Sequence, residues 1–209
     1  HQHGYGVIPG SYDIDFQVAE DTRVNTTVVA TVITGFIPTL IDTTPVVELP
    51  LGAPAPTVRA DITASDIEDG DLTGDIIITG DTVDTNTKGI YHVTYDVVDS
   101  DSNSAVQAIR TYVVGASGIV TGNYAIFAED FTKRVGQVTT EASAITSAAS
   151  AYAQHIHTGA VVTPVLQDAG GYSTTPGSYA LTWTVATEPS TTGASQATVI
   201  TGDKPVILD

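Results

Sequence analysis

Carboxylates gather in two short stretches of this chain, and they are the residues best suited to chemistry. The first stretch holds Asp66, Glu68, Asp69 and Asp71, and the second holds Asp99 and Asp101. Ca²⁺ takes about six to eight oxygen ligands, which carboxylates supply. The two stretches therefore predict a calcium site if the fold brings them together. The alternative is a pair of solvated turns in which Asp and Gly reverse the chain; the spacing is not that of an EF-hand loop.

Histidine pairs raise the question of a second metal. His1 and His3 form one pair, and His155 and His157 form another. Alternate residues of an extended strand point to the same side, and imidazoles suit transition metals. No carboxylate or Cys pattern accompanies either pair, so they are a weak basis for a metal site. His92 is expected to be an outward-facing strand residue.

Catalytic motifs are absent from the sequence, which contains no Gly-x-Ser-x-Gly, no His-Glu-x-x-His and no Gly-rich phosphate loop. We therefore expect a protein that is not an enzyme. An intramolecular isopeptide bond, which joins a Lys to an Asn beside an acidic residue, stays open for Lys88, Lys133 and Lys204. The sequence does not show whether the three groups of such a bond lie close together.

The composition excludes several classes of protein. The formal net charge is -17, from 24 acidic and 7 basic residues, whereas nucleic-acid binding depends on clustered Lys and Arg. The absence of Cys excludes disulfides and thiol chemistry. Surface proteins of Gram-positive bacteria and archaea often lack Cys, which favours an extracellular location. No apolar run approaches the roughly 20 residues of a spanning helix, and the absence of Met indicates a processed or excised chain.

One segment of the chain occurs twice. Residues 4–42 align without a gap on residues 171–209, at a constant offset of 167 (171 - 4). The shared motifs are Pro-Gly-Ser-Tyr at 9–12 and 176–179, and Ala-Thr-Val-Ile-Thr-Gly at 30–35 and 197–202. Self-similarity at a fixed period indicates a tandem array. Phe16 aligns with Trp183, and the alternating polar neighbours favour a core anchor there over an exposed platform for stacking sugars.

Residues 1–42 are predicted to be the C-terminal half of a β-sandwich module, repeated at 168–209. Apolar and acidic residues alternate from Tyr12 to Phe16, as in a half-buried strand, and Val28 to Ile33 is a second β-branched run. An isolated hairpin is only marginally stable in water. Either the other half of this module has been removed, or strands of a neighbouring chain complete it.

Residues 43–115 are predicted to form an immunoglobulin-like β-sandwich, because several short strands separated by turns fill this segment. In such a sandwich, the loop after the second strand and the turn between the last two strands lie at the same end. The six acidic residues would then converge beside the preceding module and the linker residue Asp42. A cation bound there would stiffen the junction.

Four motifs of this segment carry a resemblance to a known family. They are Asp66 to Thr73, Gly89 to Tyr95, Asp99 to Ala105 and Arg110 to Val114. Together they resemble the bacterial Ig-like modules that repeat in cell-surface proteins and are appended to some pesticidal crystal toxins. The resemblance covers about residues 43–114 and implies the Ig-like fold and a spacer role. Ser102 stands where the family usually has Gly, and Asn103 is expected to preserve the turn because it tolerates the left-handed conformation.

Residues 116–209 are predicted to form a second β-sandwich module. Its first residues belong to a Gly/Ser/Val linker at 115–122, and its strands follow that linker. Thr139 to Gln154 is its one helix candidate, with Thr139 or Thr140 as the cap. The stretch from Ala128 to Thr132, with the later Pro-Gly-Ser-Tyr, is similar to another β-sandwich repeat of Firmicute wall proteins.

These patterns predict an all-β protein of tandem Ig-like β-sandwiches, with one short helix in the last module. The expected function is structural and extracellular: a stalk, or a filament-forming subunit of a cell-surface fibre that self-associates as a homopolymer or tandem array through strand edges. An adhesin, a carbohydrate-binding module that takes a glycan, and a spacer of a larger secreted enzyme stay open. A binding module should be monomeric with a concave, aromatic-lined patch.

Overall fold

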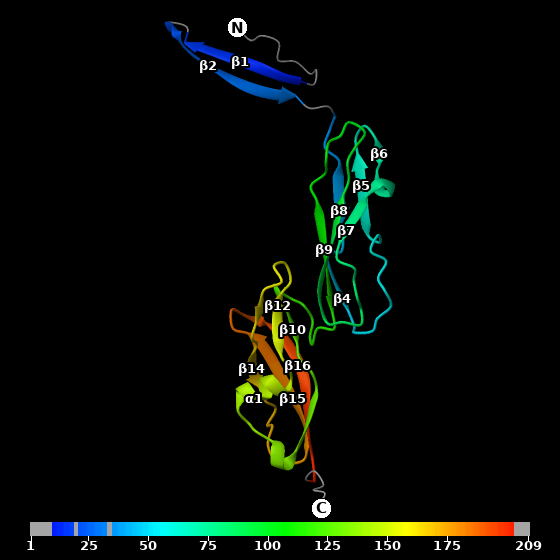
Figure 1. The fold of residues 1–209 in the computed structure, drawn as a ribbon, viewed down its shortest axis with the longest axis vertical. Helices are drawn as coiled ribbons and strands as arrows, with labels where there is room; N and C mark the ends of the chain where they lie inside the picture. The colour runs from blue at the N-terminus through cyan, green and yellow to red at the C-terminus, as the bar shows by residue number, and fades with distance from the viewer. Residues whose placement is uncertain (1–9, 19–20, 33–34, 203–209) are drawn as a thin grey trace, which may run out of the picture. The chain divides into compact units, whose positions relative to one another are not determined.

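A computed structural model describes residues 10–18, 21–32 and 35–202 (Figure 1). Most of the described residues with regular secondary structure lie in strands. Within the described ranges, the strands form several sheets and there is one α-helix, which confirms the predicted all-β class.

The chain divides into two compact units. The first contains residues 1–42, 62–78 and 95–108, and the second contains residues 43–61, 79–94 and 109–209. Each unit therefore draws on segments that are far apart in the sequence. The module boundaries predicted from the sequence stay a prediction.

The first unit begins with a hairpin. β1 (Gly10–Val18) and β2 (Asp21–Val32) pair antiparallel, and a bulge interrupts their register after Gln17. In the described part of the chain, no further strand joins this two-stranded sheet. The apolar side chains of Phe16 and Val28 are exposed as a result.

A three-stranded sheet follows in the same unit. Its strands are β3 (Thr39–Asp42), β5 (Ile62–Asp66) and β6 (Gly70–Asp71), in the order β3-β5-β6. Ile62 and Ala64 alternate with exposed residues along β5 and are buried, as expected when one face of a strand packs on a core. A short 3-10 helix, Thr73–Asp75, follows β6.

A four-stranded sheet has the order β4-β9-β8-β7. Its strands are β4 (Val46–Leu49), β7 (Ile77–Gly80), β8 (Gly89–Asp96) and β9 (Ala108–Val114), and β4 runs parallel to β9. Val93 and Tyr95 are buried and lie on the same face of β8, because alternate residues of a strand point to the same side.

Arg110 in β9 is a buried charged residue, with an exposed fraction of 2%. Its Nη1 donates to the carbonyl oxygen of Ala60 at 2.7 Å and to that of Val58 at 3.4 Å. A buried guanidinium needs acceptors, and the segment that supplies these two carbonyl groups lies outside any strand. The guanidinium therefore fixes an irregular stretch that has no ladder to hold it.

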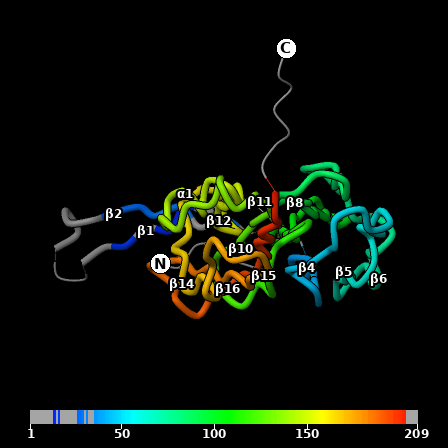
Figure 2. The backbone as a smooth tube through the Cα atoms, turned by 90° about the horizontal axis from the view of Figure 1, so that it is seen from below, coloured from blue at the N-terminus to red at the C-terminus, as the bar shows by residue number. Residues whose placement is uncertain are grey.

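Two sheets build the C-terminal part of the second unit. One has the order β10-β12-β13, from Tyr124–Phe127, Tyr152–His155 and Val161–Val162. The other has the order β11-β16-β15-β14, from Phe131–Arg134, Glu188–Ile200, Gly177–Val185 and Val165–Asp168. β15 and β16 run side by side in both views (Figures 1 and 2).

Trp183 lies at the centre of the C-terminal core and is fully buried, as predicted for a core anchor. Its Nε1 donates to Ser195 Oγ at 2.9 Å. Leu181, Ala197 and Ile145 belong to the same cluster. Burying one large apolar side chain contributes roughly 2–3 kcal/mol, so this cluster is a major source of stability for the module.

The helix is shorter than predicted. α1 spans Ala142–Ala148, and its N-cap is Glu141, which makes no side-chain capping hydrogen bond. The prediction of a helix to Gln154 capped by Thr139 or Thr140 was therefore wrong. The chain leaves the helix at Ser150, which has a φ of 46°, and then forms β12, where Tyr152 stacks on Phe127.

The segment predicted to be a linker is hydrogen-bonded to its neighbours. Ser117 N–H donates to Ile126 O, its Oγ donates to Ala128 O, and its carbonyl accepts from Ala194 N–H. Ala116 and Val120 pack against a buried cluster that contains Val113 and Phe127. This stretch thus ties β9 to β10 and β16 within the second unit.

Among the described helices, none is long and apolar enough to cross a membrane.

Candidate functional site

Asp66 organises the acidic loop. Its Oδ1 accepts the N–H groups of Glu68 at 2.8 Å and Asp69 at 3.3 Å. Burial raises the pKa of Asp66, but these backbone donors outweigh it, and the pKa lies below its ordinary value. Hydrogen bonds from the side chain and backbone of Thr73 likewise lower the pKa of Asp71. Both carboxylates therefore act as acceptors that shape the loop.

Asp69 joins the acidic loop to the later turn. Ser100 donates its N–H to Asp69 Oδ2 and its hydroxyl to Asp69 Oδ1, both at 2.8 Å. Within the turn, Asn103 donates its N–H to Asp99 Oδ1 at 2.7 Å and its Nδ2 to Asp99 Oδ2 at 2.9 Å. The two acidic stretches thus lie together, as the predicted Ig-like fold requires.

The segment after the hairpin contacts this acidic end. Phe36 N–H donates to Glu68 Oε2 at 3.0 Å, and Asn103 Nδ2 donates to Phe36 O at 3.5 Å. Gly35 has a φ of 64°, and a Cβ there would lie 2.7 Å from Asp101 Oδ2. The acidic end therefore holds residues 35–36, whereas Asp42 belongs to β3 and pairs with Ile62.

Metal binding at this end stays a prediction. Within the described ranges, no group of three or more His, Asp or Glu residues is arranged to hold an ion. Asp66, Asp69, Asp71 and Asp99 all accept hydrogen bonds from the protein. One oxygen, Asp66 Oδ2, is buried without a hydrogen-bond partner.

The histidines have structural contacts where the structure describes them. His155 Nδ1 accepts the N–H groups of His157 and Thr158, at 3.2 and 3.3 Å. His92 lies on the face of β8 opposite the buried Val93 and Tyr95, and it is half-buried there, where its Nε2 donates to Ile156 O at 2.7 Å. His1 and His3 lie outside the described residues. Lys88 pairs with Glu129, its Nζ 2.7 Å from the carboxylate, and Lys204 is also outside.

The N-terminal hairpin is the second candidate feature, because it duplicates the hairpin of β15 and β16 pair by pair. Gly10 pairs with Val32 as Gly177 pairs with Val199, and the same offset of 167 (177 - 10) holds at every later pair. Even the bulge recurs, before Val18 in one hairpin and before Val185 in the other. Over the paired residues of the two hairpins, the sequence repeat is thus also a repeat of backbone pairing.

The two hairpins differ in what covers them. Phe16 is 55% exposed, whereas its counterpart Trp183 is 0% exposed. Val28 is 51% exposed, whereas its counterpart Ser195 is 9% exposed. The expectation that Phe16 anchors a core is therefore met at its counterpart, and Phe16 itself presents an apolar surface.

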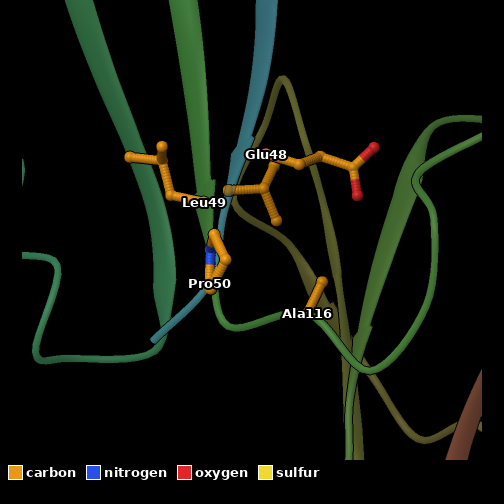
Figure 3. Close-up of a pocket in the computed structure, with 5 residues that line it drawn as sticks. Glu48, Leu49, Pro50 and Ala116 are labelled. Atoms are coloured by element: carbon orange, nitrogen blue, oxygen red, sulfur yellow. The ribbon is translucent and has the colours of Figure 1, made fainter. Parts of the chain in front are cut away.

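A pocket of about 360 Å³ lies beside β4. Figure 3 shows Glu48, Leu49, Pro50 and Ala116 in its lining, with the Glu48 carboxylate directed away from Leu49. Glu48 is the one ionisable residue among those that line it, and it lacks a nearby partner group in that lining for acid–base chemistry. The absence of an enzymatic activity stays a prediction.

Comparison with known families identifies part of the chain. Residues 58–114 match the family described as "Bacterial surface protein, Ig-like domain". This match confirms the Ig-like resemblance, and it associates the segment with cell-surface or extracellular proteins. None of the curated proteins matches the chain.

Solved structures give more distant similarities. The lipoprotein BT2262 from Bacteroides thetaiotaomicron is 21% identical, with a TM-score of 0.33, over 69% of this chain and 60% of that one. The CBM51-2 and INT domains of Clostridium perfringens ZmpB, in complex with GlcNAc, are 19% identical, with a TM-score of 0.31, over 70% of this chain and 29% of that one. The chain therefore spans less than two thirds of either structure.

Proposed function

We propose that this protein is a structural extracellular protein: a tandem-repeat stalk, or a filament-forming subunit of a cell-surface fibre. The observation that carries the proposal is the duplicated hairpin. It has the register of a hairpin that is completed elsewhere in the same chain, yet Phe16 and Val28 are exposed. Exposed strand edges beside apolar side chains favour association with further strands.

The acidic composition fits the same role. With a net charge of -17, the chain has a strongly solvated surface, and two copies of it repel each other electrostatically. Specific contacts are needed to overcome this repulsion. Association would therefore depend on apolar faces such as that of β1 and β2. The Ig-like segment would act as a spacer between the modules that associate.

Sedimentation velocity over a concentration series tests the proposal. A filament-forming subunit should give species larger than one chain, and their fraction should increase with salt because screening weakens charge repulsion; a stalk should give a single elongated species. A single species of one chain at every concentration and salt level, with binding to a glycan, would favour a binding module instead.

A further inference from the structure

The hairpin of β15 and β16 shows what such a hairpin packs against in this fold. β11 lies parallel beside β16, pairing Phe131 with Ala197, and β14 lies antiparallel beside β15. Ile145 of α1 packs in the same cluster as Trp183. All of these covering elements lie within residues 123–170. The first half of the module therefore covers the hairpin of β15 and β16, which forms the second half.

Two positions on the covered face change together between the hairpins. In the completed module, Trp183 donates to Ser195 inside the core. At the same positions the N-terminal hairpin has Phe16 and Val28, which have neither a donor nor an acceptor in the side chain. A buried N–H or hydroxyl without its partner is costly, and here both members of the pair are replaced by apolar groups. The pair is therefore suited to a dry core rather than to water.

We propose that the apolar face of β1 and β2 is covered by a counterpart of residues 123–170 from the preceding repeat of the same array. By the shared register, a parallel strand would lie beside residues 30–32 of β2, and an antiparallel strand beside residues 15–17 of β1. A helix equivalent to α1 would lie over Phe16. This inference rests on the proposed function, because it names the partner of the exposed edges.

The preceding repeat is a better partner than a second copy of this chain. Residues 123–170 of this chain are already closed by β15 and β16. An exchange of hairpins between two copies would expose one apolar hairpin for each one it covers, so it would bury no additional surface. A first half that lacks its own hairpin has no such competitor.

Extending the full chain tests the proposal. A second copy of residues 116–170 is fused directly ahead of Gly4, because Gly4 is the counterpart of Gly171. Amide hydrogen exchange of β1 and β2 is then compared with that of β15 and β16. We expect the N-terminal hairpin to gain the protection of the C-terminal one. Unchanged fast exchange of β1 and β2 would overturn the inference.

Two neighbouring valines provide matched variants of the extended chain. Val28 and Val29 are 51% and 62% exposed in the present structure, but their counterparts are the buried Ser195 and the exposed Gln196. Val28→Asp should abolish the gained protection, and Val29→Asp should leave it in place. Equal effects of the two changes would contradict the predicted face.

Disulfide capture gives a second readout, since the chain has no Cys. Thr31 is the counterpart of Thr198, which pairs with Thr132. Thr31→Cys should therefore form a disulfide with Thr132→Cys of the added segment, whereas Thr27→Cys should not. A disulfide between two unextended chains, one with each change, would instead identify a second copy as the partner and overturn the inference.

The outcomes separate this inference from the proposed function. Ordered polymers of the native protein without protection or capture in the extended chain would leave the proposed function standing and remove the inference. Protection and capture without polymers would support the inference and count against a filament.

Discussion

Ser102 adopts a left-handed backbone conformation, with a φ of 71°, in the turn that contacts the acidic loop. The sequence predicted that Asn103 would take this conformation, and this prediction was wrong by one residue. Asn103 is engaged instead with both oxygens of Asp99. Ser102 therefore occupies a position at which Gly would adopt the backbone conformation without the steric strain that a Cβ causes.

Ser102→Gly should stabilise the protein by about 1 kcal/mol, because an L residue in the left-handed region costs about that much. Urea denaturation would measure the change in the free energy of unfolding. Ser104→Gly is the matched control: Ser104 lies in an isolated bridge with Val98, and Gly there should be neutral or destabilising. Equal stabilisation by both changes would contradict this explanation of the turn.

The acidic loop should make stability depend on pH. Hydrogen bonds hold the pKa of Asp66 and Asp71 below the ordinary value. A carboxylate with a lowered pKa in the folded state contributes stability above its unfolded pKa, about 3.9. That contribution is lost as the pH falls through the lowered folded-state pKa. Denaturation at pH 7, 4 and 2.5 should therefore show stability falling on the acid side, with a smaller fall for Asp71→Asn.

At the scale of the element, α1 is a weak helix. It spans Ala142–Ala148 and lacks a side-chain cap at Glu141, although Ile145 is buried against the core. Short helices derive most of their stability from tertiary packing. The core contact of Ile145 therefore stabilises the helix, and a side-chain cap at its N-terminus should stabilise it further.

Glu141→Ser should raise the melting temperature, because a capping hydroxyl contributes about 0.5–2 kcal/mol where no cap exists. Glu141→Ala is the control, and it should not raise the melting temperature since it adds no acceptor for the first turn. If Ser and Ala had the same effect, a cap would not be what the helix lacks.

The register of the strands was predictable from the sequence, and the extent of the helix was not. The ungapped repeat makes each residue of β1 and β2 equivalent to one residue of β15 and β16. The register must then be the same in both hairpins, because a slip by one residue would move every side chain to the other face. The Ala-rich stretch after Thr139 carries a helical pattern into Tyr152, but stacking on Phe127 and pairing with β10 override it. Propensity yields to tertiary contacts of this kind.

At the scale of the whole molecule, the sequence predicted that the acidic loop and the Asp99–Asn103 turn would meet. It could not predict the donors that meet there: Ser100 satisfies Asp69, and Phe36 N–H reaches Glu68. The exposure of Phe16 was equally hidden, since its pattern is that of a core residue. Which face is covered depends on chain segments that the local pattern does not specify.

Calcium should raise the melting temperature if the acidic end binds it, because a ligand that binds only the folded state stabilises it, by about 2.7 kcal/mol at 100 times its Kd. Melting with Ca²⁺ and with EDTA would measure this shift, and Asp101→Asn should reduce it. Mg²⁺ at the same ionic strength controls for screening of the net charge. Identical curves in Ca²⁺ and EDTA would remove the site.

Electron microscopy of the native material is the most direct test of a protein built by repetition for extension. We expect ordered fibres or stalks whose axial period corresponds to one repeat, with density covering the apolar face of β1 and β2. Dispersed single particles, in which that hairpin packs into a compact globule around a ligand pocket, would contradict a structural role.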